Sequence, residues 1–198
     1  RLWPESRKKF PKQFIKFFKN DSLFDLTLKR IKSISNKNLP IIIGNEEYRF
    51  YINKALEKQS IQGTCIHEPI GKNTTASIYI GAKFSKLTDE LIFIPSDHLI
   101  KNEVLFKQTI ESALKEKTKM QWVIFGVKPN EPNTGYGYIK TTDDLEEKIF
   151  LKKILKFTEK PNLKTAKYYL EHNHLWNAGI FMGNAKMVIK SIQEHAPD

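Results

Sequence analysis

"LPIIIGNEEYRFYINKALEK" (residues 39–58) decides the fold, because a short apolar run is followed directly by a longer segment whose apolar residues recur at helical spacing. The same order of strand-like run and helical segment returns at 64–87 and at 90–116, and a further apolar run occupies 121–127. A strand followed by a helix must return in the same direction to pair again. We therefore predict a doubly wound α/β fold, in which a mostly parallel sheet is flanked by helices on both faces.

The pattern changes on the C-terminal side of these units. "GYGYIKTT" (135–142) and "KIFLKKILKFTEK" (148–160) are typical of longer strands on either side of an acidic turn, which predicts a small antiparallel excursion. A helix, a strand and a last helix are expected at 162–173, 175–183 and 184–195. Because no internal repeat or flexible linker interrupts the chain, we expect residues 1–198 to form one domain.

The composition narrows the choice of partner. The formal net charge of +11 favours an anionic partner, but only four of the 33 basic residues are arginines, the side chains that sequence-specific nucleic-acid readers use most. The lysines are spread along the chain as solvated faces, so we expect no nucleic-acid partner. We also expect no membrane partner, because the apolar runs are far shorter than the roughly 20 residues that span a bilayer. Cys65 is the single cysteine, which favours a cytoplasmic location and a core role for the thiol.

Polar residues follow several of the expected strands, where open α/β sheets bind ligands. In "FIPSDHLI" (93–100), Asp97 follows Ser96 directly after a strand, and a carboxylate at such an edge could hold Mg²⁺ together with substrate phosphates. The alternative is an aspartate in a turn or at the N-cap of the next helix. The sequence "HNH" (172–174) could suggest a metal, but two histidines in a polar loop are more simply surface residues.

Six segments together carry a resemblance to a known family. They are "RLWPESRKKFPKQF", "EPIGKNTTASI", "FIPSDHLI", "FGVKPNEPNTGYGYI", "FTEKP" and "WNAGIFM". In order and spacing they resemble the bacterial mannose-1-phosphate guanylyltransferases, also called GDP-mannose pyrophosphorylases, over essentially the whole chain. The resemblance implies a nucleotidyltransferase fold and the reaction of GTP with mannose 1-phosphate to give GDP-mannose and pyrophosphate, with Mg²⁺ as cofactor.

The resemblance also implies roles for individual residues on the nucleotide side. Arg1 would contact the triphosphate, and Lys12 would neutralise charge on the reacting phosphates; these two are the expected catalytic residues. The expected nucleotide-binding residues are Glu68, Pro69, Asn73, Thr74, Ser96 and Asp97, and Asp97 is the expected metal ligand. The plain alternatives are a basic surface turn for the opening segment and a helix entry capped by Asn73. Family members usually carry Arg where Lys72 stands, so a bidentate phosphate contact is not expected there.

On the sugar-phosphate side, the resemblance implies four residues. The backbone at Gly137 would approach the sugar, Glu159 and Asn177 would bind its hydroxyls, and Lys160 would pair with its phosphate. A kinked strand at Gly137 and a surface charge pair at Glu159 and Lys160 are the alternatives.

The resemblance further implies that the chain is a fragment of a catalytic domain. The family places a strand and a glycine-rich phosphate loop before the residue that matches Arg1, and a second metal-binding aspartate beyond the C-terminal helix. Two other functions stay open: a related nucleotidyltransferase that uses another sugar 1-phosphate or nucleotide, and a non-catalytic regulatory or polyanion-binding domain. A homo-oligomer is compatible with the sequence, which does not fix the oligomeric state.

Overall fold

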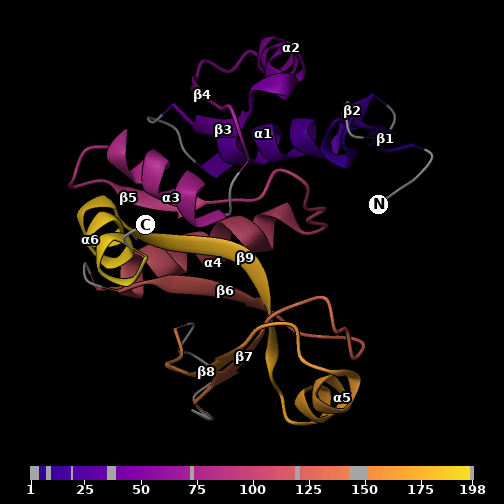
Figure 1. The fold of residues 1–198 in the computed structure, drawn as a ribbon, viewed down its shortest axis with the longest axis vertical. Helices are drawn as coiled ribbons and strands as arrows, with labels where there is room; N and C mark the ends of the chain where they lie inside the picture. The colour runs from indigo at the N-terminus through magenta and orange to yellow at the C-terminus, as the bar shows by residue number, and fades with distance from the viewer. Residues whose placement is uncertain are drawn as a thin grey trace. The chain divides into compact units, whose positions relative to one another are not determined.

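The computed structural model divides the chain into two compact units, which we describe separately (Figure 1). The residues that it describes are 5–7, 10–18, 20–34, 39–71, 74–118, 121–142 and 151–196. The first unit consists of Arg1–Leu87, Pro95–Gln108 and Ile189–Asp198, and the second of Thr88–Ile94 and Thr109–Val188.

The first unit is built around a two-stranded parallel sheet. Its elements are the 3-10 turn η1 (Lys12–Phe14), β1 (Lys16–Phe18), β2 (Asp21–Ser22), α1 (Leu23–Ile34), β3 (Ile41–Asn45), η2 (Glu46–Tyr48), α2 (Arg49–Gln59), β4 (Thr64–Glu68) and α3 (Thr74–Lys83). Strands β3 and β4 pair in parallel from Ile41 opposite Thr64 to Asn45 opposite Glu68, with α2 as the crossover. This is the strand–helix–strand unit that the opening stretch predicts.

The core of the first unit lies between α1, α2 and one face of this sheet. Buried side chains of both helices pack together there, with Ile42 of β3 and Cys65 of β4 against them. The buried members are Phe24, Leu28, Ile52, Ala55 and Leu56. The half-buried Cys65 therefore has the expected core role, and burial raises the pKa of its thiol.

Helix α1 is a local element that the sequence reading did not identify. Its start is a reciprocal cap: the Asp25 N–H donates to Ser22 Oγ at 3.1 Å, and the Ser22 N–H donates to Asp25 Oδ2 at 2.8 Å. These bonds satisfy backbone donors that the first helical turn leaves without partners. The signal was present in the sequence as Ser-x-x-Asp followed by apolar residues at helical spacing.

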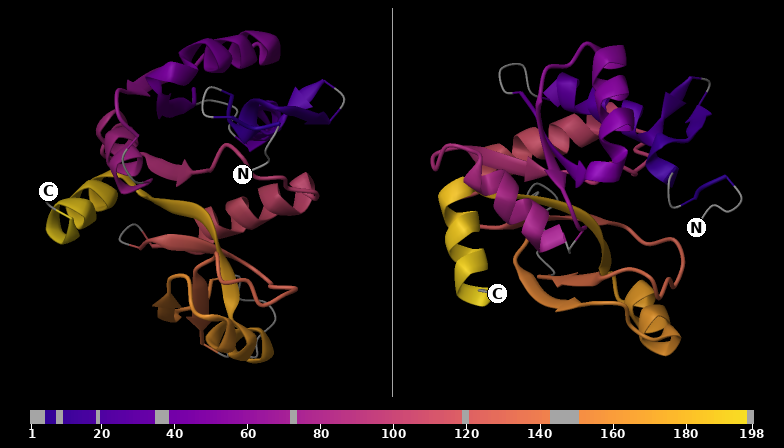
Figure 2. Two further views of the ribbon diagram at one scale, coloured as in Figure 1. Left: turned by 45° about the vertical axis from the view of Figure 1, so that its right-hand side comes forward. Right: turned by 45° about the horizontal axis from the view of Figure 1, so that its top comes forward.

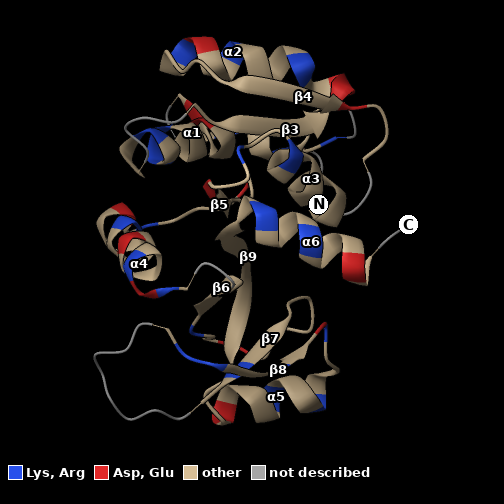
Figure 3. Cartoon of the chain, turned by 90° about the vertical axis from the view of Figure 1, so that its left-hand side faces the viewer, with Lys and Arg blue, Asp and Glu red and all other residues tan. Residues whose placement is uncertain are grey.

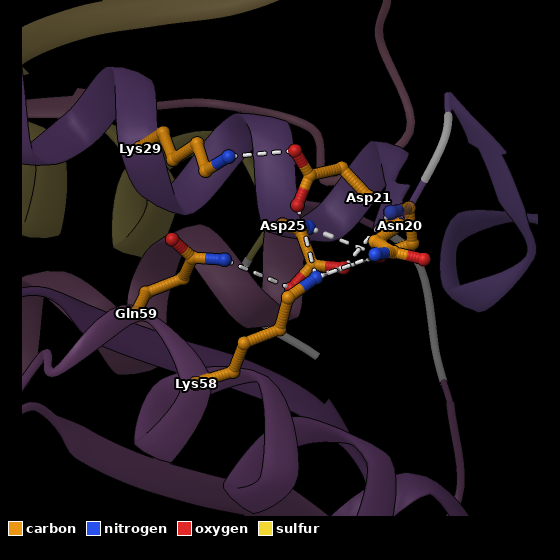
Figure 4. Close-up of polar contacts among 7 residues, drawn as sticks. Asn20, Asp21, Asp25, Lys29, Lys58 and Gln59 are labelled. Atoms are coloured by element: carbon orange, nitrogen blue, oxygen red, sulfur yellow. Dashed lines mark hydrogen bonds and ion pairs between the residues drawn. The ribbon is translucent and has the colours of Figure 1, made fainter.

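A charged cluster ties α2 to the start of α1 (Figure 4). The Lys58 ammonium donates to the Asn20 carbonyl at 2.6 Å and to Asp21 Oδ1 at 2.9 Å, and its Nζ lies 3.1 Å from Asp25 Oδ2. Burial favours protonation of Asp25, but hydrogen bonds from Ser22 and the Lys58 side chain outweigh it and lower the pKa of this carboxyl. The cluster thus fixes two helices to each other through satisfied charges.

The second unit contains a five-stranded sheet in which the paired strands are antiparallel. Its strands are β5 (Glu90–Phe93), β6 (Val123–Val127), β7 (Tyr138–Thr141), β8 (Ile154–Thr158) and β9 (Leu175–Asn184), and α5 (Leu163–Glu171) precedes β9. Helices α4 (Glu103–Glu116) and α6 (Ala185–His195) have residues in both units. Strand β9 pairs with β5, β6 and β7 (Figures 1 and 2).

These pairings confirm the α/β class and show where the expected sheet differs in detail. Phe181 and Met182 of β9 pair with β5 and also with β6, so β9 lies between these two strands. Strands β5 and β6 therefore run in the same direction without pairing to each other. The expected antiparallel excursion is present as β7 and β8, while the acidic turn lies outside the described residues.

Charged residues are spread over several helices of the structure. Lys and Arg positions are distributed over α2, α4 and α6 and are mixed with acidic positions (Figure 3), as expected of solvated faces. Among the helices of the described part, none has the length and apolar character needed to cross a membrane.

Candidate active site

Two expected site residues that are far apart in the sequence form an ion pair in the first unit. Lys12 Nζ lies 2.6 Å from Asp97 Oδ2. Lys12 opens η1, and Phe14 in the same turn packs against Phe24 of α1, with ring centroids 5.5 Å apart. The Lys12 and Asp97 side chains are 46% and 28% exposed, so both are accessible to a ligand.

The immediate surroundings of Asp97 distinguish between the alternatives for this residue. Ser96 and Asp97 form a half-buried turn, but the cap of α4 comes from Asn102, whose Oδ1 accepts from the Leu105 N–H at 2.9 Å. Asp97 is therefore not the N-cap of the next helix. His98 Nε2 lies 4.0 Å from Asp97 Oδ1. Burial lowers the pKa of His98, Asp97 opposes that shift, and Lys12 adds to it, so the imidazole is largely neutral at pH 7.

Arg30 of α1 is a buried residue near this turn that sequence reasoning missed. Its side chain is 1% exposed, and its Nη2 donates to the His98 carbonyl at 3.5 Å. Burial lowers the pKa of the Arg30 guanidinium, and the charge of Glu103 opposes that shift. Sequence reasoning did not predict α1, so Arg30 was not recognised as part of an amphipathic helix. In a predicted helix of this kind, an arginine among lysines would have been a visible signal.

Glu68 and Pro69, two of the expected nucleotide-binding residues, lie at the exit of β4. Glu68 ends this strand, half-buried, and its Oε1 accepts from Ser77 Oγ of α3 at 3.0 Å. Pro69 is exposed in the following loop, and Thr74 is exposed at the first residue of α3. Asn73, Lys72 and Arg1 lie outside the described residues, so the alternative cap by Asn73 and the expected roles of Arg1 and Asn73 stay predictions.

The second unit brings the four expected sugar-phosphate residues together. The Asn177 N–H donates to the Gly137 carbonyl at 2.8 Å. A Cβ at Gly137 would lie 2.7 Å from Phe157 Cζ and 2.8 Å from Glu159 Oε2. Gly137 therefore allows two side chains to approach the strand closely, and a side chain at this position would have to displace the ends of Phe157 and Glu159.

The Glu159–Lys160 turn contains a second lysine–carboxylate pair. Lys160 Nζ pairs with Glu159 Oε1, and both side chains are largely exposed. The backbone of Lys160 is left-handed, with φ of 43°, which is uncommon for a residue other than glycine. At Asn177, Oδ1 accepts from the Gly179 N–H at 2.9 Å. A charge pair at the surface and a ligand site both fit this turn, so its role stays a prediction.

Packed aromatic rings lie behind this turn. Thr158, directly before Glu159, has its Oγ1 3.0 Å from Tyr169 Oη, and the Tyr169 ring stacks on His174 with centroids 4.2 Å apart. The interpretation of both histidines as surface residues is therefore wrong for His174, which is 5% exposed, and right for the exposed His172. Burial lowers the pKa of His174.

Comparison with known proteins gives a match along the entire chain. Residues 1–198 match the family described as Nucleotidyl transferase. The chain is 38% identical over 200 residues to a mannose-1-phosphate guanylyltransferase of Salmonella montevideo, with 98% of this chain and 42% of that protein covered. It is 34% identical over 203 residues to the alginate biosynthesis protein AlgA of Pseudomonas aeruginosa, again with 42% of the relative covered.

Solved structures agree with this result. A crystal structure of mannose-6-phosphate isomerase from Helicobacter pylori superposes with a TM-score of 0.85 at 31% identity, covering 96% of this chain and 72% of that one. Of the curated sequence relatives that it matches, the chain spans about two fifths of the length.

Proposed function

Since the chain belongs to the nucleotidyl transferase family, we propose that it transfers a guanylyl group from GTP to mannose 1-phosphate, giving GDP-mannose and pyrophosphate. The names of the relatives support the choice of GTP and mannose 1-phosphate. The observation that carries the proposal is the pairing of Lys12 with Asp97, because it puts an ammonium, which can bind phosphate, and a carboxylate, which can bind Mg²⁺, at one accessible point of the first unit.

In the proposed reaction, an oxygen of the sugar phosphate attacks the α-phosphorus of GTP. A bond from this oxygen to the phosphorus forms, the bond to the bridging oxygen breaks, and pyrophosphate leaves with the electron pair. Two anions must approach each other, so fixed positive charge is the main requirement. Lys12 supplies that charge from η1 by exchanging its contact with Asp97 for the phosphate oxygens. Arg1 is proposed to bind the triphosphate.

Asp97 can serve as one ligand of Mg²⁺, and the remaining ligands would have to come from substrate phosphates and water. No group of three or more potential metal ligands occurs in the described part of the chain. Mg²⁺ in nucleotide sites is commonly held by one or two carboxylates, substrate phosphates and water, so the accessible Asp97 fits as one such ligand. When bound, the ion would neutralise charge on the phosphates. Ser96, in the same turn, is proposed to contact the nucleotide.

Glu68 is proposed to accept from guanine N–H groups at the exit of β4. Its Oε1 already accepts from Ser77, which holds the carboxylate in one orientation and leaves Oε2 as the acceptor for the base. Pro69 is proposed to line the base pocket, and Asn73 and Thr74 to make polar contacts with base and ribose.

The sugar phosphate is proposed to bind in the second unit. Glu159 accepts hydrogen bonds from sugar hydroxyls, and Lys160 exchanges its contact with Glu159 for the phosphate. The Asn177 amide donates to a further hydroxyl, since its oxygen is held by the Gly179 N–H. Gly137 lets the strand end approach the sugar. We further propose that residues 1–198 are part of one catalytic domain that acts in the cytoplasm.

The test uses the product of the complete reading frame. Pyrophosphate release and GDP-mannose formation are measured with GTP and mannose 1-phosphate together, and with each left out. Equal turnover with ATP, CTP or UTP would refute the guanine assignment and leave a related nucleotidyltransferase. The similar Helicobacter pylori protein is named as an isomerase, so conversion of mannose 6-phosphate to fructose 6-phosphate is assayed on the same preparation. Isomerisation without GDP-mannose formation would overturn the proposal.

A further inference from the structure

Arg30 has an unusual environment for a charged side chain. It extends from α1 into the interior of the first unit, is 1% exposed, and lies with its guanidinium carbon 5.7 Å from the centroid of the Phe106 ring. Its Nη1 donates to Thr27 Oγ1 at 3.4 Å, and its Nε has no hydrogen-bond partner among the described residues. Burying an incompletely paired charge is unfavourable, so stability alone is a poor explanation for an arginine here.

The two other contacts of Arg30 fall within the connection between β5 and α4 and on the first residue of α4. Nη2 donates to the carbonyl of His98 at 3.5 Å, and Nε lies 3.8 Å from Oε1 of Glu103, the first residue of α4. His98 lies within this connection, directly after Asp97, and Glu103 is the residue at which α4 begins. The planar guanidinium can contact both residues at once, which a lysine ammonium cannot do with the same geometry.

We propose that Arg30 is a positioning residue that fixes the Asp97 turn through its contacts with the His98 carbonyl and with Glu103 at the start of α4. The inference rests on the proposed function, in which Asp97 is a ligand to Mg²⁺. Arg30 itself touches neither the metal nor the substrates. By holding the carbonyl next to Asp97, it keeps the carboxylate beside Lys12 before the nucleotide arrives. Loss of groups that orient a metal ligand commonly weakens metal affinity by about 10–100-fold.

The experiment replaces Arg30 in the product of the complete reading frame. Arg30→Met removes the charge and both contacts while keeping a long apolar stem, and Arg30→Lys keeps the charge but reaches one partner at a time. Arg49→Met, at the exposed first residue of α2, is the matched control. Hydrogen–deuterium exchange at the amides of residues 96–103 is measured beside the Mg²⁺ midpoint of GDP-mannose synthesis.

We expect Arg30→Met to exchange faster at residues 96–103 and to raise the Mg²⁺ midpoint about tenfold, with the KM for mannose 1-phosphate unchanged. Arg30→Lys should show smaller changes of the same kind, and Arg49→Met none. A variant that lowers the melting temperature but keeps the wild-type exchange at 96–103 and the wild-type midpoint overturns the proposal. If Arg30→Met does not fold, Arg30→Lys decides by the same criteria.

Failure of the proposed function would be recognised separately. If the wild-type protein makes no GDP-mannose, the function is wrong, and the exchange measurement still shows whether Arg30 holds the connection. Unchanged exchange in both Arg30 variants then refutes the positioning role as well.

Discussion

Replacement of Lys12 by Met should separate catalysis from stability. The ammonium is 46% exposed and its partner Asp97 is 28% exposed, so the ion pair lies in a partly solvated place. Pairs of that kind contribute about 0.2–1 kcal/mol to folding. In a protein of this size, about 1 kcal/mol shifts the melting temperature by roughly 2–4 °C. We therefore expect only a small change in melting temperature.

The expected effect on turnover is much larger. A fixed positive charge on a phosphoryl transition state commonly contributes about 10²–10⁵ in rate, and a 100-fold loss corresponds to about 2.7 kcal/mol in the barrier. The loss should fall on kcat, since the charge is needed most when two phosphate groups meet. Steady-state synthesis of GDP-mannose at saturating substrates measures it.

Lys54→Met is the matched control, because Lys54 is an exposed lysine of α2 in the same unit. It should leave both kcat and the melting temperature unchanged. A Lys12→Met protein with wild-type kcat would show that Lys12 is an ordinary surface lysine without a catalytic role. A variant that loses stability and rate in proportion would show that the pair is structural, and either result refutes the reasoning.

Three further predictions concern single substitutions. Asp97→Asn should keep the fold but abolish most turnover at ordinary Mg²⁺, with residual activity at higher metal; an unchanged metal midpoint in a Mg²⁺ titration would make Asp97 a turn residue only. Asp25→Ala should lower the free energy of unfolding by about 2 kcal/mol, because it removes the buried carboxylate that accepts from the Ser22 N–H at the start of α1 and pairs with Lys58. The pKa of the Asp25 carboxyl in the folded protein is below its usual value of 3.8, so its contribution to wild-type stability is present above pH 3.8 and is lost as the pH falls further. Urea unfolding of the wild-type and Asp25→Ala proteins from pH 7 to pH 2 checks this. Equal loss of stability in acid for the two proteins would contradict it. Gly137→Ala should leave the protein folded, because the atoms a Cβ would meet are the ends of the flexible Phe157 and Glu159 side chains, but it should raise the KM for mannose 1-phosphate by displacing Glu159; an unchanged KM would separate Gly137 from the sugar site.

The strand–helix units were predictable from the sequence because each depends on neighbouring residues. β4 has the expected limits of 64–68, and α4 begins one residue after the expected position and ends at the expected Glu116. In these segments apolar spacing, turn residues and chain direction agree with one another. The position of β9 between β5 and β6 depends on pairing between distant segments, which periodicity does not encode.

In the candidate site, too, local features could be predicted from the sequence and contacts between distant segments could not. The family resemblance implied separate roles for Lys12 and Asp97 toward the nucleotide phosphates and Mg²⁺, but their 2.6 Å contact depends on how η1 packs against α1, a helix that was not identified. Arg30 was missed for the same reason. His174 was misread because its two-residue separation from His172 suggests a polar loop, whereas stacking on Tyr169 buries it.

The most direct test of the account is nucleotide-dependent product formation by the product of the complete reading frame. We predict that GDP-mannose and pyrophosphate appear in equal amounts, only when GTP, mannose 1-phosphate and Mg²⁺ are all present, and that Lys12→Met reduces both products together. Product formation that is independent of mannose 1-phosphate, or that proceeds equally well with the other nucleoside triphosphates, would contradict the account.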